Sequence, residues 1–210
     1  MDVLIYLFDG ITALDAVGPY EVLTRLPEAQ VRFVGERVGP ARTDNGALAL
    51  MCDVARDEVD RADILLMPGG FGTRRLEGDA AVLDWVRRVD ATTRTTMSVC
   101  TGSLVLAAAG LLRDRQATTH WASLDRLAEH GAQPTKERVV TSGKYVTAAG
   151  VSAGIDMALR YAADSFGDEL AQTLQLGIEY DPDPPFDCGT PEKAPEPIVK
   201  AILDRFAARS

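Results

Sequence analysis

Unbroken runs of apolar residues, rather than alternating apolar and polar ones, mark the main strands that this sequence predicts. The predicted strands occupy residues 3–8, 31–34, 64–67 and 95–99, of which 3–8 and 64–67 are apolar throughout. Strands buried on both faces have this pattern, which is typical of parallel sheets covered by helices. Helices are predicted at 14–26, 80–89, 155–166, 168–174 and 197–208. The alternation predicts one α/β domain, residues 1–210, with a mostly parallel sheet and helices on both faces.

Turn residues predict two local departures from the parallel pattern. Gly39-Pro40 and Asn45-Gly46 interrupt the stretch 38–55, which favours short antiparallel strands there. Ser142-Gly143-Lys144 separates two short apolar pairs and indicates a hairpin.

The first helix has two possible starts because it contains Pro19. If the helix spans 14–26, Asp15 lies in its first turn. Proline disrupts helix interiors but is favoured at the first helical position, so the helix could instead begin at Gly18-Pro19. Asp15 would then lie in the loop at the carboxyl end of the first strand.

The stretch Ser98-Val99-Cys100-Thr101-Gly102 joins a predicted strand directly to an Ala/Leu-rich helix. Small residues two positions before and after Cys100 give the pattern of a nucleophile elbow, with Cys in place of Ser. The turn places Cys100 at the helix N-terminus, where unpaired N–H groups and the helix dipole are expected to favour a thiolate. The alternative is a buried core cysteine without a chemical role.

Composition narrows the classes of function. The chain has 210 residues, 46% of them hydrophobic, and a formal net charge of −9. This charge argues against nucleic acid and anionic membranes as partners, because both bind basic surfaces. Three separated cysteines without a C-x-x-C motif indicate neither a disulfide framework nor a zinc site. The first residues lead directly into a strand and no apolar run is long enough to span a bilayer, so we expect a reduced, cytoplasmic protein.

Three predicted loops place reactive groups at one edge of the sheet, because the carboxyl ends of parallel strands meet there. These loops carry Asp15, the Gly69-Gly70 pair and Cys100-Thr101. They supply a proton carrier, exposed backbone N–H groups for a developing negative charge, and a nucleophile. Together these groups suffice for addition to an electrophilic carbon. Asp15 could instead only cap a helix, and the glycines could form only a tight turn.

Motifs along nearly the whole chain resemble those of the DJ-1/PfpI (ThiJ/PfpI) superfamily. They are Phe8-Asp9-Gly10, Leu14-Asp15-Ala16-Val17-Gly18-Pro19, Met67-Pro68-Gly69-Gly70, Ser98-Val99-Cys100-Thr101-Gly102-Ser103 and Ala117-Thr118-Thr119-His120-Trp121. The resemblance implies a flavodoxin-like sheet and a homodimer. Within the superfamily the chain is most similar to the isonitrile hydratases, on its Cys-Thr-Gly elbow, its Leu-Asp-x-x-Gly-Pro segment, Glu179-Tyr180 and Pro184-Pro185-Phe186.

Isonitrile hydratases add water to an isonitrile, a small molecule, to give an N-substituted formamide, and they need no metal or other cofactor. The resemblance implies Cys100 as the nucleophile and Asp15 as the acid/base. It also implies Thr101 and the Gly69-Gly70 backbone as supporting groups. The expected path passes through a covalent thioimidate on Cys100.

Other activities in the superfamily stay open at this point. Glyoxalase- and deglycase-type members usually carry Glu in the first-strand loop, where this chain has Asp15, with Glu21 six residues later. The peptidase branch carries His directly after the cysteine, where this chain has Thr101. AraC-type regulators share the Cys-Thr-Gly and Thr-Thr-His-Trp motifs but add a DNA-binding half, which we do not expect here, so a stand-alone ligand or redox sensor is a further interpretation.

Three further residue types need an interpretation. His120 could act as a base, although a histidine in such a loop is more often hydrogen-bonded into the structure. Trp121 is expected in the core or in a pocket wall. Cys52 and Cys188 are not followed by the start of a predicted helix as Cys100 is, and we interpret them as structural.

Overall fold

The computed structural model describes residues 1–208, so Arg209 and Ser210 of the predicted domain lie outside the described residues. A seven-stranded sheet forms the centre, in the order β10-β11-β7-β6-β1-β2-β5. Every neighbouring pair is parallel except β10–β11. The strands are β1 (Asp2–Tyr6), β2 (Gln30–Gly35), β5 (Val54–Ala55), β6 (Ile64–Met67), β7 (Thr95–Val99), β10 (Val139–Ser142) and β11 (Tyr145–Ala148). The predicted α/β fold with a mostly parallel sheet is confirmed.

Two small sheets flank the central one. β3 (Gly39–Arg42) pairs with β4 (Ala49–Cys52) in antiparallel fashion, which confirms the prediction for residues 38–55. β8 (Gln116–Ala117) pairs with β9 (Gln133–Pro134) in parallel. The predicted hairpin around Gly143 is the β10–β11 pair.

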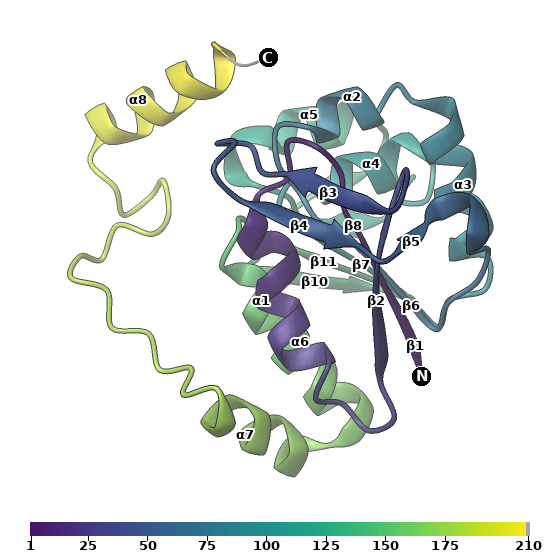
Figure 1. The fold of residues 1–210 in the computed structure, drawn as a ribbon. Coiled ribbons are helices and arrows are strands. Elements are labelled where there is room, and N and C mark those ends of the chain that lie inside the picture. Colours follow the sequence, from purple (N-terminus) through teal and green to yellow (C-terminus); the bar gives the residue numbers. More distant parts are fainter. Residues whose placement is uncertain (209–210) are drawn as a thin grey trace.

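Helices lie on both faces of the central sheet (Figure 1). On one face α1 (Ala13–Leu23) packs against α6 (Ala153–Phe166), and α7 (Asp168–Gly177) continues from α6 and packs against it. The other helices of the domain pack around α4 (Gly102–Ala108). They are α2 (Thr73–Leu76), α3 (Ala80–Asp90) and α5 (Leu124–Glu129), with short 3₁₀ turns at Arg56–Glu58 and Trp121–Ser123. An extended segment then leads from α7 around the molecule to the last helix, α8 (Glu196–Ala207).

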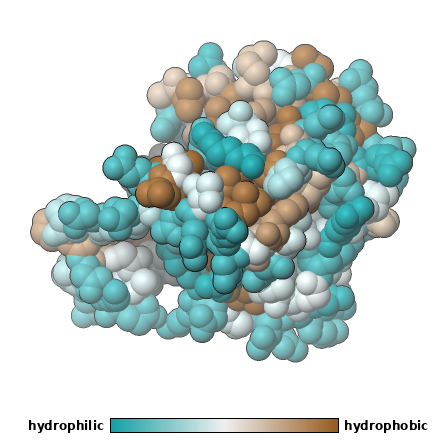
Figure 2. Space-filling model, turned by 90° about the horizontal axis from the view of Figure 1, so that it is seen from below, coloured by the Kyte–Doolittle hydropathy of each residue, from teal (hydrophilic) through white to brown (hydrophobic). Residues whose placement is uncertain are grey.

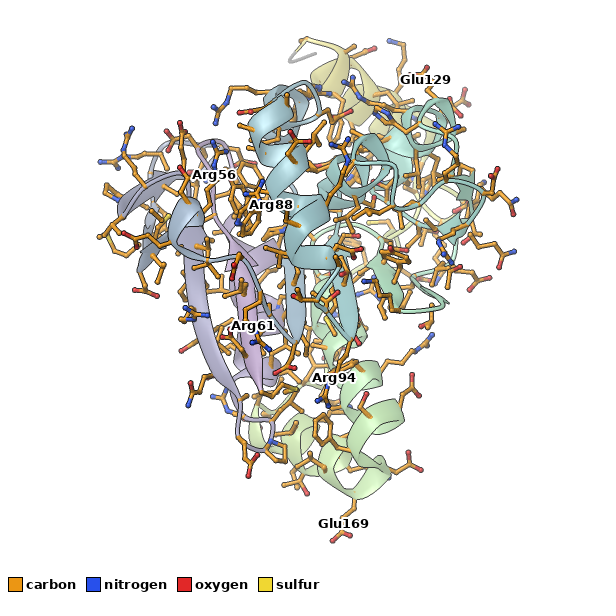
Figure 3. All side chains as sticks on the ribbon, turned by 90° about the vertical axis from the view of Figure 1, so that its right-hand side faces the viewer. Arg56, Arg61, Arg88, Arg94, Glu129 and Glu169 are labelled. Carbon is orange, nitrogen blue, oxygen red and sulfur yellow. The ribbon has the colours of Figure 1, made fainter. Side chains whose placement is uncertain are left out.

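The core confirms why the apolar runs are unbroken. Side chains of β1 and β6 are buried on both faces of the sheet, and Val3–Ile5 and Ile64–Met67 expose none of their surface. The face seen from below in Figure 2 carries many hydrophilic residues with hydrophobic areas between them. Charged side chains such as Glu129 and Glu169 project at opposite ends of the molecule (Figure 3). Within residues 1–208, no helix has the length and hydropathy that crossing a membrane requires.

Helix α1 begins at Ala13, which rules out the alternative start at Gly18-Pro19. Asp15 therefore lies in the first turn of a helix, not in the preceding loop. Pro19 lies inside this helix and cannot donate a hydrogen bond to the Asp15 carbonyl. Packing explains why the helix continues, because the buried Pro19 ring fills the space over Gly154 of α6, where an added Cβ would lie 2.9 Å from Pro19 Cγ.

Candidate active site

Cys100 occupies the sharp turn between β7 and α4, and its backbone has the strain expected of a nucleophile elbow. Its φ of 56° lies in the left-handed region, which costs a non-glycine residue roughly 1–2 kcal/mol. The Cys100 N–H donates to the carbonyls of Ala148 and Ala149, at 3.1 and 2.8 Å. Its carbonyl accepts hydrogen bonds from Ser103 Oγ at 3.2 Å and Thr119 Oγ1 at 2.9 Å. Contacts from β7, β11, α4 and the β8 loop thus hold the strained turn in place.

Asp15 brings a buried carboxyl group to this cysteine. Its side chain is fully buried, and Oδ2 accepts the Gly69 N–H at 2.9 Å. Among the described residues, Oδ1 has no hydrogen-bond partner of normal geometry. Burial raises the pKa of Asp15 from 3.8 to about 7, and hydrogen bonds from the Gly69 N–H and the Cys100 thiol oppose this rise. Asp15 can therefore both accept and donate a proton near neutral pH.

The expectation of a resting thiolate at Cys100 is wrong. Burial raises the pKa of the Cys100 thiol, and the negative charge of Asp15 raises it further. Hydrogen bonds from the Val151 N–H, the Thr101 N–H and the Thr101 hydroxyl lower this pKa but do not offset the burial. The resting site is a thiol beside a carboxyl group.

The Gly69-Gly70 turn approaches the site closely, but its N–H groups are not open to substrate as the sequence predicted. Gly69 donates to Asp15, and the Gly70 N–H donates to Thr101 Oγ1 at 2.9 Å. An added Cβ on Gly69 would lie 2.6 Å from the Thr101 nitrogen and 2.7 Å from Asp15 Oδ2. The turn therefore positions Asp15 and Thr101, and glycine at position 69 permits this close approach.

Val151 is a site residue that sequence reasoning missed. Its N–H and that of Thr101 act as backbone donors to the Cys100 sulfur. It also has a strained backbone, with φ at 27°. The sequence does show glycine and alanine residues around position 151, directly after a strand, which indicates a tight turn near the site. This pattern does not reveal which N–H faces the sulfur.

The two residues left as alternative acid/bases have other roles. His120 Nδ1 accepts the Ala122 N–H at 3.2 Å, and burial lowers the pKa of His120 to about 4, so the ring is neutral at pH 7. Glu21 is half-exposed and pairs with Arg25 at 2.7 Å on the outer face of α1. Of the three carboxyl or imidazole candidates, only Asp15 interacts with Cys100.

A cavity of about 240 Å³ opens onto Cys100 and Thr101. This volume is smaller than the ~300–1,000 Å³ of pockets for drug-sized ligands, so the site fits a small molecule. Its apolar wall comprises Phe71, Leu104, Val151, Ile202 and Phe206, and its charged and polar lining includes Thr12, Asp44, Arg74, His120, Arg126 and Arg205. Within residues 1–208, no three His, Cys, Asp or Glu side chains are grouped as metal ligands would be.

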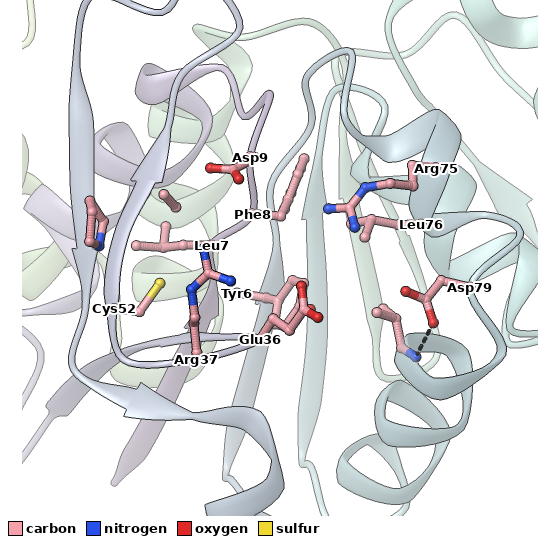
Figure 4. A pocket seen from close by; sticks show the side chains of 13 residues that line it. Tyr6, Leu7, Phe8, Asp9, Glu36, Arg37, Cys52, Arg75, Leu76 and Asp79 are labelled. Carbon is pink, nitrogen blue, oxygen red and sulfur yellow. Dashed lines mark hydrogen bonds between the residues drawn. The ribbon is translucent and has the colours of Figure 1, made fainter.

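A second cavity of about 210 Å³ lies at the end of β1, away from Cys100 (Figure 4). It mixes carboxylates and guanidinium groups, among them Asp9, Glu36, Arg37 and Arg75. Asp79 at its edge caps α3 by accepting the N–H groups of Ala81 and Val82. Cys52 is its one thiol, and burial raises its pKa, so this cavity offers no activated nucleophile.

Comparisons with other proteins agree with this geometry. The DJ-1/PfpI family model matches residues 1–164. The isonitrile hydratase of Pseudomonas putida is 44% identical over 201 residues, which cover 96% of this chain and 88% of that enzyme. The transcriptional regulator CdhR of Pseudomonas aeruginosa is 34% identical over 75% of this chain, which spans only 48% of the regulator.

A solved structure extends the match to the C-terminal segment. The crystal structure of a ThiJ/PfpI family protein from Pseudomonas syringae has a TM-score of 0.94 and 36% identity, covering 99% of this chain and 86% of that one. The sequence resemblance to the superfamily is thereby confirmed, and this chain belongs to the DJ-1/PfpI family.

Proposed function

We propose that this protein is an isonitrile hydratase, which converts R–N≡C and water into R–NH–CHO. The observation that carries the proposal is the buried Asp15 carboxyl group, with a pKa of about 7, interacting with the Cys100 thiol. The extended similarity to an isonitrile hydratase supports the same chemistry.

The first step joins the sulfur to the terminal carbon of the isonitrile. As the carboxylate form of Asp15 takes the thiol proton, Cys100 Sγ bonds to the carbon. Asp15 then delivers that proton to the carbon, which gives the thioimidate Cys100–S–CH=N–R. Because burial keeps the sulfur protonated at rest, proton removal accompanies the attack instead of preceding it. The Val151 and Thr101 N–H groups stabilise negative charge on the sulfur.

The second step consumes water and releases the cysteine. Asp15 accepts a proton from water as the oxygen adds to the thioimidate carbon, and Asp15 then passes this proton to the nitrogen, which leaves Asp15 ionised again. The C–S bond then breaks as the carbonyl forms, and the hydroxyl proton returns through Asp15 to the sulfur. The products are R–NH–CHO and the free thiol, so the enzyme is regenerated without another reactant.

A redox-sensing role has less support from this site. Cysteines that sense oxidants are accessible and largely thiolate. Cys100 is only 5% exposed, and burial raises its pKa.

Turnover of cyclohexyl isocyanide by the purified protein tests the proposal. We expect N-cyclohexylformamide to form, and rapid acid quenching followed by peptide mass spectrometry to show an adduct on Cys100. Cys100→Ser should abolish both signals, whereas Cys188→Ser, at an exposed position outside the Cys100 pocket, should retain them. No turnover of several isonitriles by protein whose Cys100 still alkylates would contradict the proposed function.

A further inference from the structure

Helix α8 supplies one wall of the Cys100 pocket although it lies beyond residues 1–164, which match the family model. Its contributing side chains are Ile202, Arg205 and Phe206. Their spacing of three and four residues places them on one face of the helix. One wall of the pocket therefore comes from outside residues 1–164.

The core of the domain does not account for this placement. No side chain of α8 is buried, and residues 178–195 before it bury none either. This segment runs outside the domain from α7 to α8 (Figure 1). The contacts of α8 with the pocket, rather than burial in the core, therefore account for where the helix lies.

Phe206 joins two other walls of the pocket. Its ring stacks on His120, with centroids 4.7 Å apart and an interplanar angle of 18°. It also packs against Phe71 at 5.3 Å with a tilt of 55°. Both distances fall within the ~4.5–7 Å of favourable aromatic pairs. Phe71 follows the Gly69-Gly70 turn, so Phe206 links that turn to the His120 loop and limits the width of the pocket.

We propose that α8 is the specificity element of this enzyme. Phe206 and Ile202 contact the substituent R of the isonitrile, and Phe206 sets the largest substituent that the pocket admits. The inference rests on the proposed function for the identity of the substrate, and it assigns Phe206 no part in the proton transfers or bond formation. It implies that R is compact, because the cavity holds only about 240 Å³, and that R is apolar where it meets Ile202 and Phe206.

Kinetics of Phe206→Ala with methyl, cyclohexyl and 1-adamantyl isocyanide test the proposal. For cyclohexyl isocyanide we expect KM to rise about tenfold and kcat to change less than about twofold, because an apolar contact to R is lost and the reacting groups are untouched. The ratio of kcat/KM for adamantyl over cyclohexyl isocyanide should rise about tenfold. Ile202→Ala should act in the same direction.

Leu203→Ala is the matched control. It truncates a neighbouring apolar side chain of α8 that is 44% exposed and does not line the pocket. We expect this variant to keep the wild-type ranking of the three isonitriles. A ranking that is the same in Phe206→Ala, Leu203→Ala and the wild type would overturn the role of α8 and leave the hydratase function intact.

Alkylation of Cys100 tests the same wall without turnover. N-ethylmaleimide and N-cyclohexylmaleimide differ in the size of one substituent, and N-acetylcysteine gives their rate ratio for a free thiol. We expect wild-type Cys100 to disfavour the cyclohexyl reagent relative to that thiol, and Phe206→Ala to remove at least about fivefold of this discrimination. If the discrimination falls but no isonitrile is turned over, α8 controls the pocket and the proposed substrate is wrong. Equal discrimination in both proteins overturns the proposal.

Discussion

The negative charge of Asp15 has two opposing effects on the Cys100 thiol. A carboxylate at Asp15 raises the pKa of Cys100, yet that carboxylate is the base that must take the thiol proton. Asp15→Asn separates the two effects because it keeps the shape and removes the charge. We expect turnover to fall about a hundredfold or more, the usual size of general acid–base catalysis. Alkylation of Cys100 by iodoacetamide should become faster, since its pKa falls. If turnover stays near the wild-type rate, Asp15 is not the acid/base.

The pH dependence of kcat/KM follows from the same carboxyl group. Asp15 must be ionised to accept the thiol proton, and its pKa is about 7. We expect kcat/KM to decline below an apparent pKa near 7, and the residual activity of Asp15→Asn to lack this acidic limb. An acidic limb near pH 4, where an unperturbed aspartate titrates, would contradict the raised pKa.

Asp15 should change the pH dependence of the free energy of unfolding in the direction opposite to that of an ordinary ion-paired aspartate. The folded pKa of about 7 exceeds the unfolded value of 3.8, so the folded state binds the proton more tightly. The contribution of Asp15 is therefore most favourable below about pH 4 and is lost as the pH rises through 7. Urea unfolding should show Asp15→Asn gaining stability relative to the wild type over this interval, up to about 4 kcal/mol. A stability difference that does not change with pH would show that Asp15 has no raised pKa.

At the scale of elements, the sequence predicts the strands well because their signal is local. The runs 3–8 and 64–67 are apolar since both faces of β1 and β6 are buried. Helix α2 was missed because it has four residues and no side-chain cap. The sequence predicts the Gly69 N–H at the correct edge of the sheet but as a donor to substrate. Its actual acceptor, Asp15, was not foreseen because it is 54 residues away in the sequence. Burial, which decides the pKa of Cys100, likewise depends on elements distant in the chain.

The junction between β6 and α4 should tolerate no side chain at Gly102. An added Cβ there would lie 2.0 Å from the Met67 carbonyl oxygen, a backbone atom that cannot move independently. We expect Gly102→Ala to lower the free energy of unfolding by about 2 kcal/mol or more. Gly177→Ala is the matched control, because Gly177 is in α7 and an added Cβ has no neighbour within 4 Å. It should raise stability by up to about 1 kcal/mol. Equal unfolding midpoints for the two variants would contradict this view of the junction.

The whole molecule exposes more surface than its mass predicts. Its accessible surface is 10526 Å². A monomeric protein of 22.6 kDa has about 9,500 Å² by the usual scaling. The excess of about 1,000 Å² is similar to the ~800 Å² that one partner buries in a standard interface. The extended segment 178–195, with its exposed Phe186, accounts for part of this surface.

We therefore keep the homodimer as a prediction and place it on this excess surface. Light scattering after size-exclusion chromatography should give about twice 22.6 kDa at micromolar concentration. The measurement should be repeated after tenfold dilution, because interface area alone does not set the dissociation constant. Phe186→Ser should shift the equilibrium toward monomer if the 75% exposed Phe186 lies in the interface, while Val38→Ser, at a 57% exposed position before β3, serves as the control. A single species of 22.6 kDa at all concentrations would show that the extended segment is exposed in a monomer, and the homodimer prediction would be wrong.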